Sequence, residues 1–323
     1  MDDPKDCPRK CYRTSSTKLV DIECKDKKNI KPFKQAMLIE AIKYIPTKWL
    51  THKILKGVTN QCSNWNKTTS STREDIRTYI DDYQIDWTEA EKCRYSESVD
   101  ECVDTFETKN EFFQRALKPE NIKIQFKRNK NVLVSPADCR LTAYENVKKA
   151  TKFWVKGHGF SLEKLLGDVN MAKEYVGGSL VICRLAPDDY HRFHMPINCV
   201  YEGHHKIHGH YYSVDTRIVN STIDVFGENK REVHRLYNEH FGTVLCVIVG
   251  ATCTGSIEID PSVKKNHKYT KGAPLGMFGF GGSTIIMVFE PHIKLELCGI
   301  FKDNSLKHVE TYVKVGTKLG AVL

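Results

Sequence analysis

The spacing of apolar positions changes about a third of the way along the chain. At residues 32–56 they recur at roughly helical intervals, interrupted by Pro46, which predicts two helices. Residues 61–72 are rich in Ser, Thr and Asn and predict a loop, and residues 74–113 predict a second helical run. Residues 1–30 are polar and lysine-rich, which predicts a mobile arm.

Short β-rich runs separated by Gly, Pro and Asn take over from residue 122. They predict strands at residues 131–135, 179–185, 211–214, 244–249, 256–259 and 284–289, and residues 311–323 predict one more strand and a turn. We therefore expect an α+β protein, with a helical region at residues 31–113 packed on a largely antiparallel β domain at residues 114–323.

Composition limits the class of protein. The 323 residues fit one large domain or two closely packed ones. No apolar run approaches the ~18 residues of a transmembrane helix, and the amino terminus lacks the apolar stretch of a signal peptide, so we expect a cytoplasmic protein. The twelve cysteines are scattered and show no paired zinc-type spacing, which favours buried or free thiols over disulfides.

Net charge favours an acidic partner. The chain carries a formal charge of +9, with a pI near 8.8. No nucleic-acid-binding motif is present, so we expect contact with an anionic membrane surface and no nucleic acid. Trp49, with Lys43, Lys48 and Lys53 around it, would suit an interfacial helix, although burial of the same apolar stripe against the core is the interpretation that we prefer.

A glycine-rich segment carries the candidate chemistry. Gly279-Phe-Gly-Gly-Ser-Thr284 runs directly into an apolar strand, an order that fits neither a Walker loop nor a Rossmann turn. Flexible glycines let the Ser283 hydroxyl reach the carbonyl carbon of Gly282. That attack would convert the peptide bond to an ester, and elimination and hydrolysis would leave a pyruvoyl group on the new chain. The serine needs a base, and the base needs an orienting group.

Several ordered segments agree with this chemistry. They include Asn110-Glu-Phe-Phe-Gln-Arg115-Ala-Leu-Lys-Pro119, Val134-Ser-Pro-Ala-Asp138, Phe153-Trp-Val-Lys-Gly157, Asp189-Tyr-His191-Arg-Phe-His194-Met-Pro196, Gly281-Gly-Ser-Thr284 and Val313-Lys-Val-Gly316. In this order they resemble the phosphatidylserine decarboxylase family over about residues 108–320.

The resemblance implies a set of roles for self-cleavage. Asp138 orients His194, and His194 takes the proton from Ser283, so that the chain is cut between Gly282 and Ser283. The two products, residues 1–282 and 283–323, remain associated. Taken alone, Asp138 would be read as a turn residue and His194 as a core histidine.

Decarboxylation is implied by the same resemblance. The covalent pyruvoyl cofactor made from Ser283 forms a Schiff base with phosphatidylserine, and loss of CO2 gives phosphatidylethanolamine. His191 handles the proton that replaces the carboxylate, as suits a side chain that titrates near neutral pH. The alternative is that His191 only packs beside Tyr190 and Arg192.

The sequence departs from the family at two positions and lacks its frequent membrane anchor. Cys139 and Cys199 stand where glycine is usual, and a Cβ fits there only if the backbone dihedrals are ordinary. Without the anchor, membrane contact is expected to be peripheral, and a homodimer is a family expectation only. The alternative substrate is a free aromatic amino acid, as for relatives that decarboxylate tryptophan.

A histidine-rich segment at residues 203–210 raises a second alternative, a metal-binding or interaction protein that no longer cleaves itself. His208 and His210 would share one face of a strand and could bind zinc or copper. No third ligand of obvious spacing completes the set, so we favour a solvated hairpin turn and expect no metal.

Overall fold

A computed structural model describes residues 12–15, 18–21, 66–147, 161–212, 214, 224–251, 256–281, 283–307 and 309–323. The helices expected at residues 32–56, the motif at residues 153–157 and Gly282 lie outside these ranges. So does most of the arm, of which two short strands, β1 (Tyr12–Ser15) and β2 (Lys18–Asp21), pair antiparallel.

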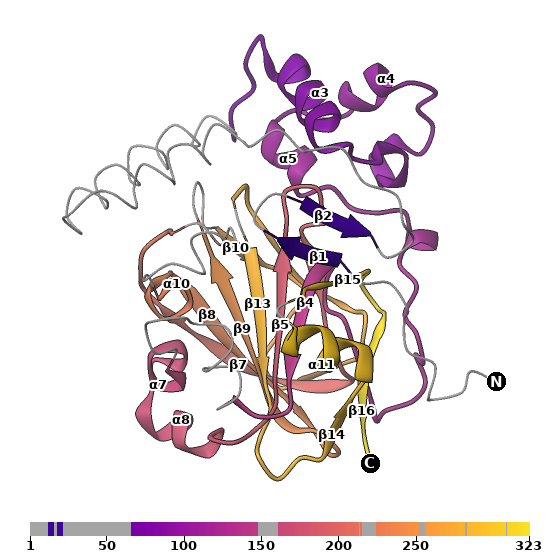
Figure 1. Ribbon diagram of the computed structural model, residues 1–323. Helices are drawn as coiled ribbons and strands as arrows, with labels where there is room; N and C mark the ends of the chain where they lie inside the picture. Colours follow the sequence, from indigo (N-terminus) through magenta and orange to yellow (C-terminus); the bar gives the residue numbers. More distant parts are fainter. Residues whose placement is uncertain are drawn as a thin grey trace.

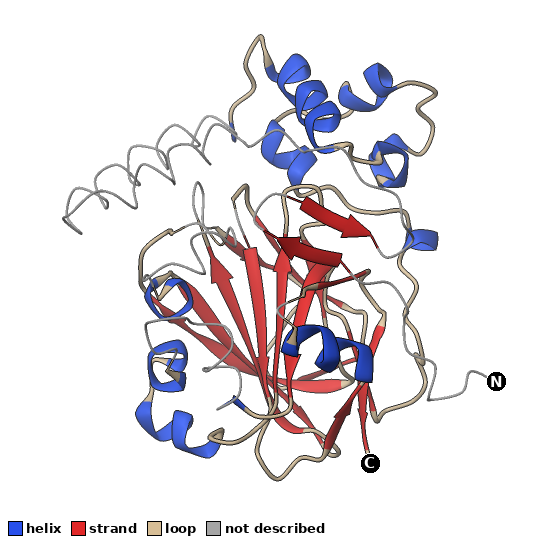
Figure 2. Ribbon diagram, viewed as in Figure 1, coloured by secondary structure: helices blue, strands red, loops and turns tan. Residues whose placement is uncertain are grey.

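An eight-stranded antiparallel sheet forms the centre of the molecule (Figures 1 and 2). Its order is β11-β7-β8-β9-β13-β5-β4-β15, so β13 lies between β9 and β5. The strands are β4 (Cys139–Tyr144), β5 (Leu180–Leu185), β7 (Cys199–Ile207), β8 (Arg231–Asn238), β9 (Gly242–Gly250), β11 (His267–Tyr269), β13 (Ser283–Val288) and β15 (Thr311–Val313).

Both faces of this sheet are buried, which explains why its central strands are apolar without interruption. Ile285 and Met287 of β13 enter one hydrophobic cluster, and Ile286 and Val288 enter another on the opposite face. The second cluster is covered by three short helices, α7 (Leu162–Leu166), α8 (Val169–Glu174) and α10 (Val225–Glu228).

Two three-stranded sheets and α11 (Gly299–Leu306) cover the other face. One sheet has the order β10-β12-β6 and the other β14-β16-β3. The strands are β3 (Val132–Val134), β6 (Arg192–His194), β10 (Ile257–Ile259), β12 (Pro274–Phe278), β14 (Leu295–Leu297) and β16 (Lys318–Val322). Every pairing between named strands is antiparallel, and the expected α+β class is confirmed.

A helical unit lies at one end of the β core, uppermost in Figure 1. It contains α3 (Thr72–Tyr83), α4 (Val99–Val103) and α5 (Lys109–Phe113), with one-turn helices η2 (Trp87–Glu89), η3 (Glu91–Cys93) and η4 (Pro119–Asn121). The single helical run expected over residues 74–113 is therefore wrong. Ser98 and Thr108 each accept a hydrogen bond from the backbone N–H three residues later, so a new helix begins at each cap.

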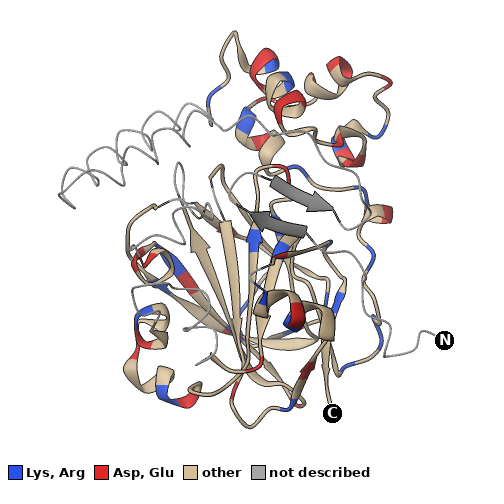
Figure 3. Cartoon of the chain, viewed as in Figure 1, with Lys and Arg blue, Asp and Glu red and all other residues tan. Residues whose placement is uncertain are grey.

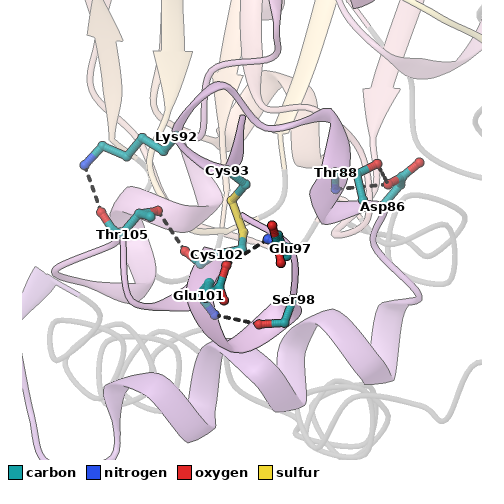
Figure 4. Close-up of a disulfide and its surroundings, with 9 residues drawn as sticks. All are labelled: Asp86, Thr88, Lys92, Cys93, Glu97, Ser98, Glu101, Cys102 and Thr105. Carbon is teal, nitrogen blue, oxygen red and sulfur yellow. Dashed lines mark hydrogen bonds between the residues drawn. A yellow bond between two sulfur atoms is a disulfide. The ribbon is translucent and has the colours of Figure 1, made fainter. Parts of the chain in front are cut away.

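A disulfide between Cys93 and Cys102 joins η3 to α4 (Figure 4). The expectation of free thiols does not hold for this pair, although Cys139, Cys183, Cys199 and Cys246 are free and buried. The expectation treated the chain as one large core. The helical unit has its own small cluster, in which both sulfurs are buried, and small cores are where disulfides add most.

Charge is mixed over the helical unit (Figure 3). Residues 66–121 contain 8 basic and 14 acidic residues, so the helical unit carries a net negative charge. In the part of the chain that the structure describes, no helix is long and apolar enough to cross a membrane.

Candidate active site

Ser283 begins the central strand β13 and is 1% exposed. It is paired with Leu185 of β5 and Gly250 of β9, which fixes its position on both sides. Its Oγ donates a hydrogen bond to the carbonyl oxygen of Gly281, at 3.4 Å. Gly281 has a φ of +143°, a conformation that side chains other than hydrogen rarely adopt. The hydroxyl is thus already turned back toward the residues that precede it.

The helical unit holds the glycine-rich loop in front of Ser283. The side-chain oxygen of Asn110 in α5 accepts a hydrogen bond from the backbone N–H of Phe280, at 2.8 Å. The Phe280 ring packs against Phe113 of α5, with 5.1 Å between ring centroids, and belongs to the hydrophobic cluster of the helical unit. Asn110 and Phe113 therefore help to form α5 and also position the loop in front of Ser283.

His191 lies against this arrangement and is fully buried. Its ring is 3.8 Å from that of Phe113, centroid to centroid. Nδ1 lies 2.8 Å from the carbonyl oxygen of Asp189, and because a carbonyl only accepts, Nδ1 carries the proton of the neutral ring. Nε2 is then the unprotonated nitrogen, and it has no hydrogen-bond partner in the described ranges.

The pKa of His191 lies well below the near-neutral value expected from the sequence. Burial, followed by the nearby charge of Arg115, lowers it to about 3. The ring is therefore a neutral imidazole with a free lone pair at physiological pH, which suits it to accept a proton before it donates one.

His194 is also buried and neutral, because desolvation lowers its pKa. Nδ1 donates to the carbonyl oxygen of Gly272, at 2.9 Å, so Nε2 again carries the lone pair. The hydroxyl of Tyr190 donates to that Nε2 at 3.0 Å. Tyr190 was not predicted from the sequence as a partner of His194, although both lie in the motif at residues 189–196.

Asp138 lies between β3 and β4 and is 3% exposed. Burial raises the pKa of its carboxyl group to about 6, although the backbone N–H of Val315, which donates to Oδ1 at 2.7 Å, acts against this. Burial raises the pKa of the Tyr190 phenol, and the negative charge of Asp138 adds to this effect.

Asp138, His194 and Ser283 are each buried, and the structure does not join them directly. Within the described ranges no hydrogen bond links Asp138 to His194 or His194 to Ser283. Tyr190 instead donates a hydrogen bond to His194, and the charge of Asp138 helps to raise the pKa of the Tyr190 phenol. The roles of Asp138, His194 and Ser283 in self-cleavage therefore stay predictions.

The two cysteines at usual glycine positions are accommodated. Cys139 begins β4 and Cys199 begins β7, and neither has a positive φ. Both side chains are buried, with Cys139 Sγ 3.6 Å from Ser135 Oγ and Cys199 Sγ 3.8 Å from the sulfur of Met195. The condition set by the sequence, ordinary backbone dihedrals, is met.

The histidine-rich segment does not place His208 and His210 together on one face of a strand. β7 ends at Ile207, and His210 lies beyond it, where it forms an isolated bridge to Asn229. Among the described residues no group of three His, Cys, Asp or Glu side chains has the geometry to hold a metal ion.

Comparison with known proteins gives the class. The sequence model of the family described as "Phosphatidylserine decarboxylase" matches residues 109–321. The "Phosphatidylserine decarboxylase proenzyme" of Fusobacterium nucleatum is 39% identical over 249 residues, which cover 77% of this chain and 78% of that protein. The protein of the same name from Chlamydia pneumoniae is 38% identical over 270 residues, covering 84% of both.

A longer relative shares the same region. "Phosphatidylserine decarboxylase proenzyme 3" of Schizosaccharomyces pombe is 44% identical over 222 residues, which are 69% of this chain but 23% of that protein. The chain therefore spans less than a quarter of this yeast relative and about four fifths of the two bacterial ones. It belongs to the phosphatidylserine decarboxylase family, and the resemblance seen in the sequence is confirmed.

Proposed function

We propose that this chain is a self-cleaving decarboxylase that converts phosphatidylserine to phosphatidylethanolamine and CO2, with a pyruvoyl group made from Ser283. The observation that carries the proposal is the position of Ser283. It is buried at the start of a central strand, behind a glycine-rich loop, with its hydroxyl on the preceding backbone. Membership of the family supports the same activity.

In the proposed cleavage, Ser283 attacks the carbonyl carbon of Gly282, and His194 removes the hydroxyl proton. The unprotonated Nε2 of His194 suits a base, and the Tyr190 hydroxyl keeps that nitrogen oriented in the uncut chain. Asp138 acts in its ionised form and stabilises the protonated ring. The new carboxylate remains on residue 282, and the nitrogen of residue 283 leaves as ammonia.

The residues present fit a pyruvoyl group, since its atoms would come from Ser283 and its surroundings are buried. When formed, the group supplies a carbonyl that condenses with the substrate amine and accepts the electrons released with CO2. His191 contributes the free lone pair of Nε2, which can take a proton from the substrate ammonium. The same proton is then available for the carbon that loses its carboxylate.

Turnover of defined vesicles tests the substrate. Purified protein is expected to produce phosphatidylethanolamine and CO2 from vesicles that contain phosphatidylserine, with phosphatidylcholine vesicles as the blank. Peripheral contact predicts that the protein sediments with the phosphatidylserine vesicles and is released by salt, because exposed charges are screened. Release of CO2 from free tryptophan or phenylalanine, with none from the lipid, would favour the alternative substrate.

Cleavage is also expected to depend on pH. Asp138 is ionised above about pH 6, and His194, with its lowered pKa, is neutral there, so both active forms are lost as the pH falls. Because a group with a pKa near 6 is about one tenth ionised at pH 5, the cleavage rate at pH 5 should be about tenfold below that at pH 8. The rate is measured from the appearance of the 41-residue fragment after cell-free synthesis.

The matched variant for this measurement is Asp138→Asn. It should cleave slowly at every pH and lose the inflection near pH 6. A wild-type rate that is the same from pH 5 to pH 8 would remove Asp138 from the proposed chemistry.

A further inference from the structure

Arg115 differs from the other buried arginines of the described chain. Arg140 forms ion pairs with two aspartates, Arg184 pairs with Glu310, and Arg231 donates to three backbone carbonyl oxygens. Arg115 is equally buried, at 5% exposed, yet neither Nε nor NH1 has a hydrogen-bond partner in the described ranges. It forms no ion pair there either.

The segment of chain that carries Arg115 is fixed by hydrogen bonds of its backbone. Arg115 follows α5, and its N–H donates to the carbonyl oxygen of Phe112 at 3.1 Å. The carbonyl oxygen of the preceding residue, Gln114, accepts a hydrogen bond from Arg192 Nε at 2.8 Å, which ties this segment to β6 beside His191. The guanidinium carbon lies 5.2 Å from the centre of the Phe112 ring. The guanidinium therefore packs near the Phe112 ring, and no carboxylate among the described residues forms an ion pair with it.

An unpaired buried guanidinium destabilises the fold unless a ligand supplies the missing charge and hydrogen-bond acceptors. Buried charges are normally paired, and buried N–H groups normally have acceptors. Desolvation lowers the pKa of Arg115, but a guanidinium stays charged at physiological pH. Nε2 of His191, whose pKa the Arg115 charge lowers, is likewise without a partner, so two incomplete polar groups share one region.

We propose that Arg115 is a substrate-binding residue that holds the phosphodiester anion of the lipid headgroup. This inference rests on the proposed function and extends it. The planar guanidinium matches the paired oxygens of a phosphate, and its orphaned N–H groups would gain acceptors on binding.

The phosphodiester is a better occupant than the substrate carboxylate. A positive charge beside the carboxylate would stabilise the ground state more than the transition state. In the transition state the negative charge moves away from the carboxylate oxygens as neutral CO2 forms. The phosphodiester keeps its charge throughout the reaction, so Arg115 can bind it without opposing the chemistry. The same contact would distinguish a phospholipid from a free amino acid, which has no second anion.

Binding is tested first on the uncut chain, Ser283→Ala, with sn-glycero-3-phospho-L-serine as the probe and calorimetry as the readout. Adding Arg115→Gln should weaken binding at least about tenfold, and Arg115→Lys should weaken it less, because the ammonium keeps the charge without the fork. Affinity for L-serine should be the same in all three. Arg77→Gln, which removes an exposed arginine of the same unit, is the matched control and should leave the affinity unchanged.

Kinetics and stability give two further readouts in the cleaved enzyme. Arg115→Gln should raise KM for the glycerophosphoserine probe at least about tenfold, with the larger effect on KM than on kcat. Its Tm should be equal to or higher than that of the parent, because the substitution removes an unpaired buried charge. A structural arginine would give the opposite result, a lower Tm.

The outcomes separate this inference from the proposed function. Equal affinity for the probe in the parent and the Arg115→Gln chain would overturn the inference, as would an equal loss of affinity for L-serine, which would place the carboxylate at Arg115. Failure of the wild-type protein to release CO2 from phosphatidylserine would overturn the function, while binding to the uncut chain would still decide the role of Arg115.

Discussion

Ser283→Ala is expected to leave one uncut chain of 37.0 kDa, whereas the wild-type protein separates on denaturation into residues 1–282 and 283–323. Alanine has no hydroxyl, so neither the ester nor the pyruvoyl group can form. The denatured intact mass measures this directly. The wild-type fragment should be lighter than a peptide that begins with serine by one molecule of ammonia.

The alanine variant should fold as the parent does. The Ser283 hydroxyl makes one long hydrogen bond, and the strand is held by its pairing with β5 and β9. Ser262→Ala, on an exposed turn, is the matched control and should cleave normally. A 41-residue fragment from Ser283→Ala would show that another group cuts the chain and would end the proposed mechanism.

His194→Ala and His191→Ala are expected to fail at different steps. Without His194 the Ser283 hydroxyl has no base, so the chain should stay uncut. Without His191 the chain should be cut, but turnover of phosphatidylserine should fall by about 10²–10⁴, the usual contribution of a positioned proton-transfer group. Intact mass reports the first step and CO2 release the second.

Packing has to be separated from chemistry in the second variant. The His191 ring packs against that of Phe113, so alanine would leave a cavity under the helical unit. His191→Gln keeps most of the volume and should lose turnover to a similar extent. His292→Ala, at a side chain that is 70% exposed, should behave as the wild type in both assays. Full turnover by His191→Gln would assign His191 to packing alone.

Strand positions could be predicted from sequence where both faces of a strand are buried. The run expected at residues 284–289 is β13, and those at 179–185 and 244–249 are β5 and β9. The run at 211–214 failed because the Asn229 side chain satisfies the backbone of Tyr212, accepting from its N–H and donating to its carbonyl oxygen at 2.8 Å each. The Asn229 side chain makes the two hydrogen bonds that a neighbouring strand would otherwise make. The local sequence pattern gives no sign of this contact.

The carboxy-terminal residues show a similar limit. One strand and a turn were expected at residues 311–323, and the structure has two strands, β15 and β16, in different sheets. The chain changes sheet at Gly316, where φ is +80° and a Cβ would lie 2.5 Å from the Lys123 carbonyl oxygen. The glycine is visible in the sequence, but the backbone that it meets is almost 200 residues away.

The residues of the candidate site could be predicted from sequence motifs, but the contacts between them could not. Ser283, His194, Asp138 and His191 were named from ordered segments, and the structure places all four in buried positions. The hydrogen bond from Phe280 to Asn110 joins residues 170 positions apart. Contacts of this kind follow from the docking of the helical unit on the β core, and periodicity along the chain carries no information on them.

The place of β13 in the sheet has a consequence for how the mature enzyme can be made. Residues 283–323 supply the central strand β13, the edge strand β15 and two strands of a smaller sheet. Cleavage in front of β13 would turn one folded chain into two that share these sheets. A cut enzyme that is unfolded by heat would then have to reassemble by a second-order encounter, and its lifetime would be set by the barrier to unfolding. The peptide bond between residues 282 and 283 would be needed once, while the single chain folds and places β13 between β5 and β9. After the cut, each molecule would retain an arrangement that its two separate chains reach far more slowly.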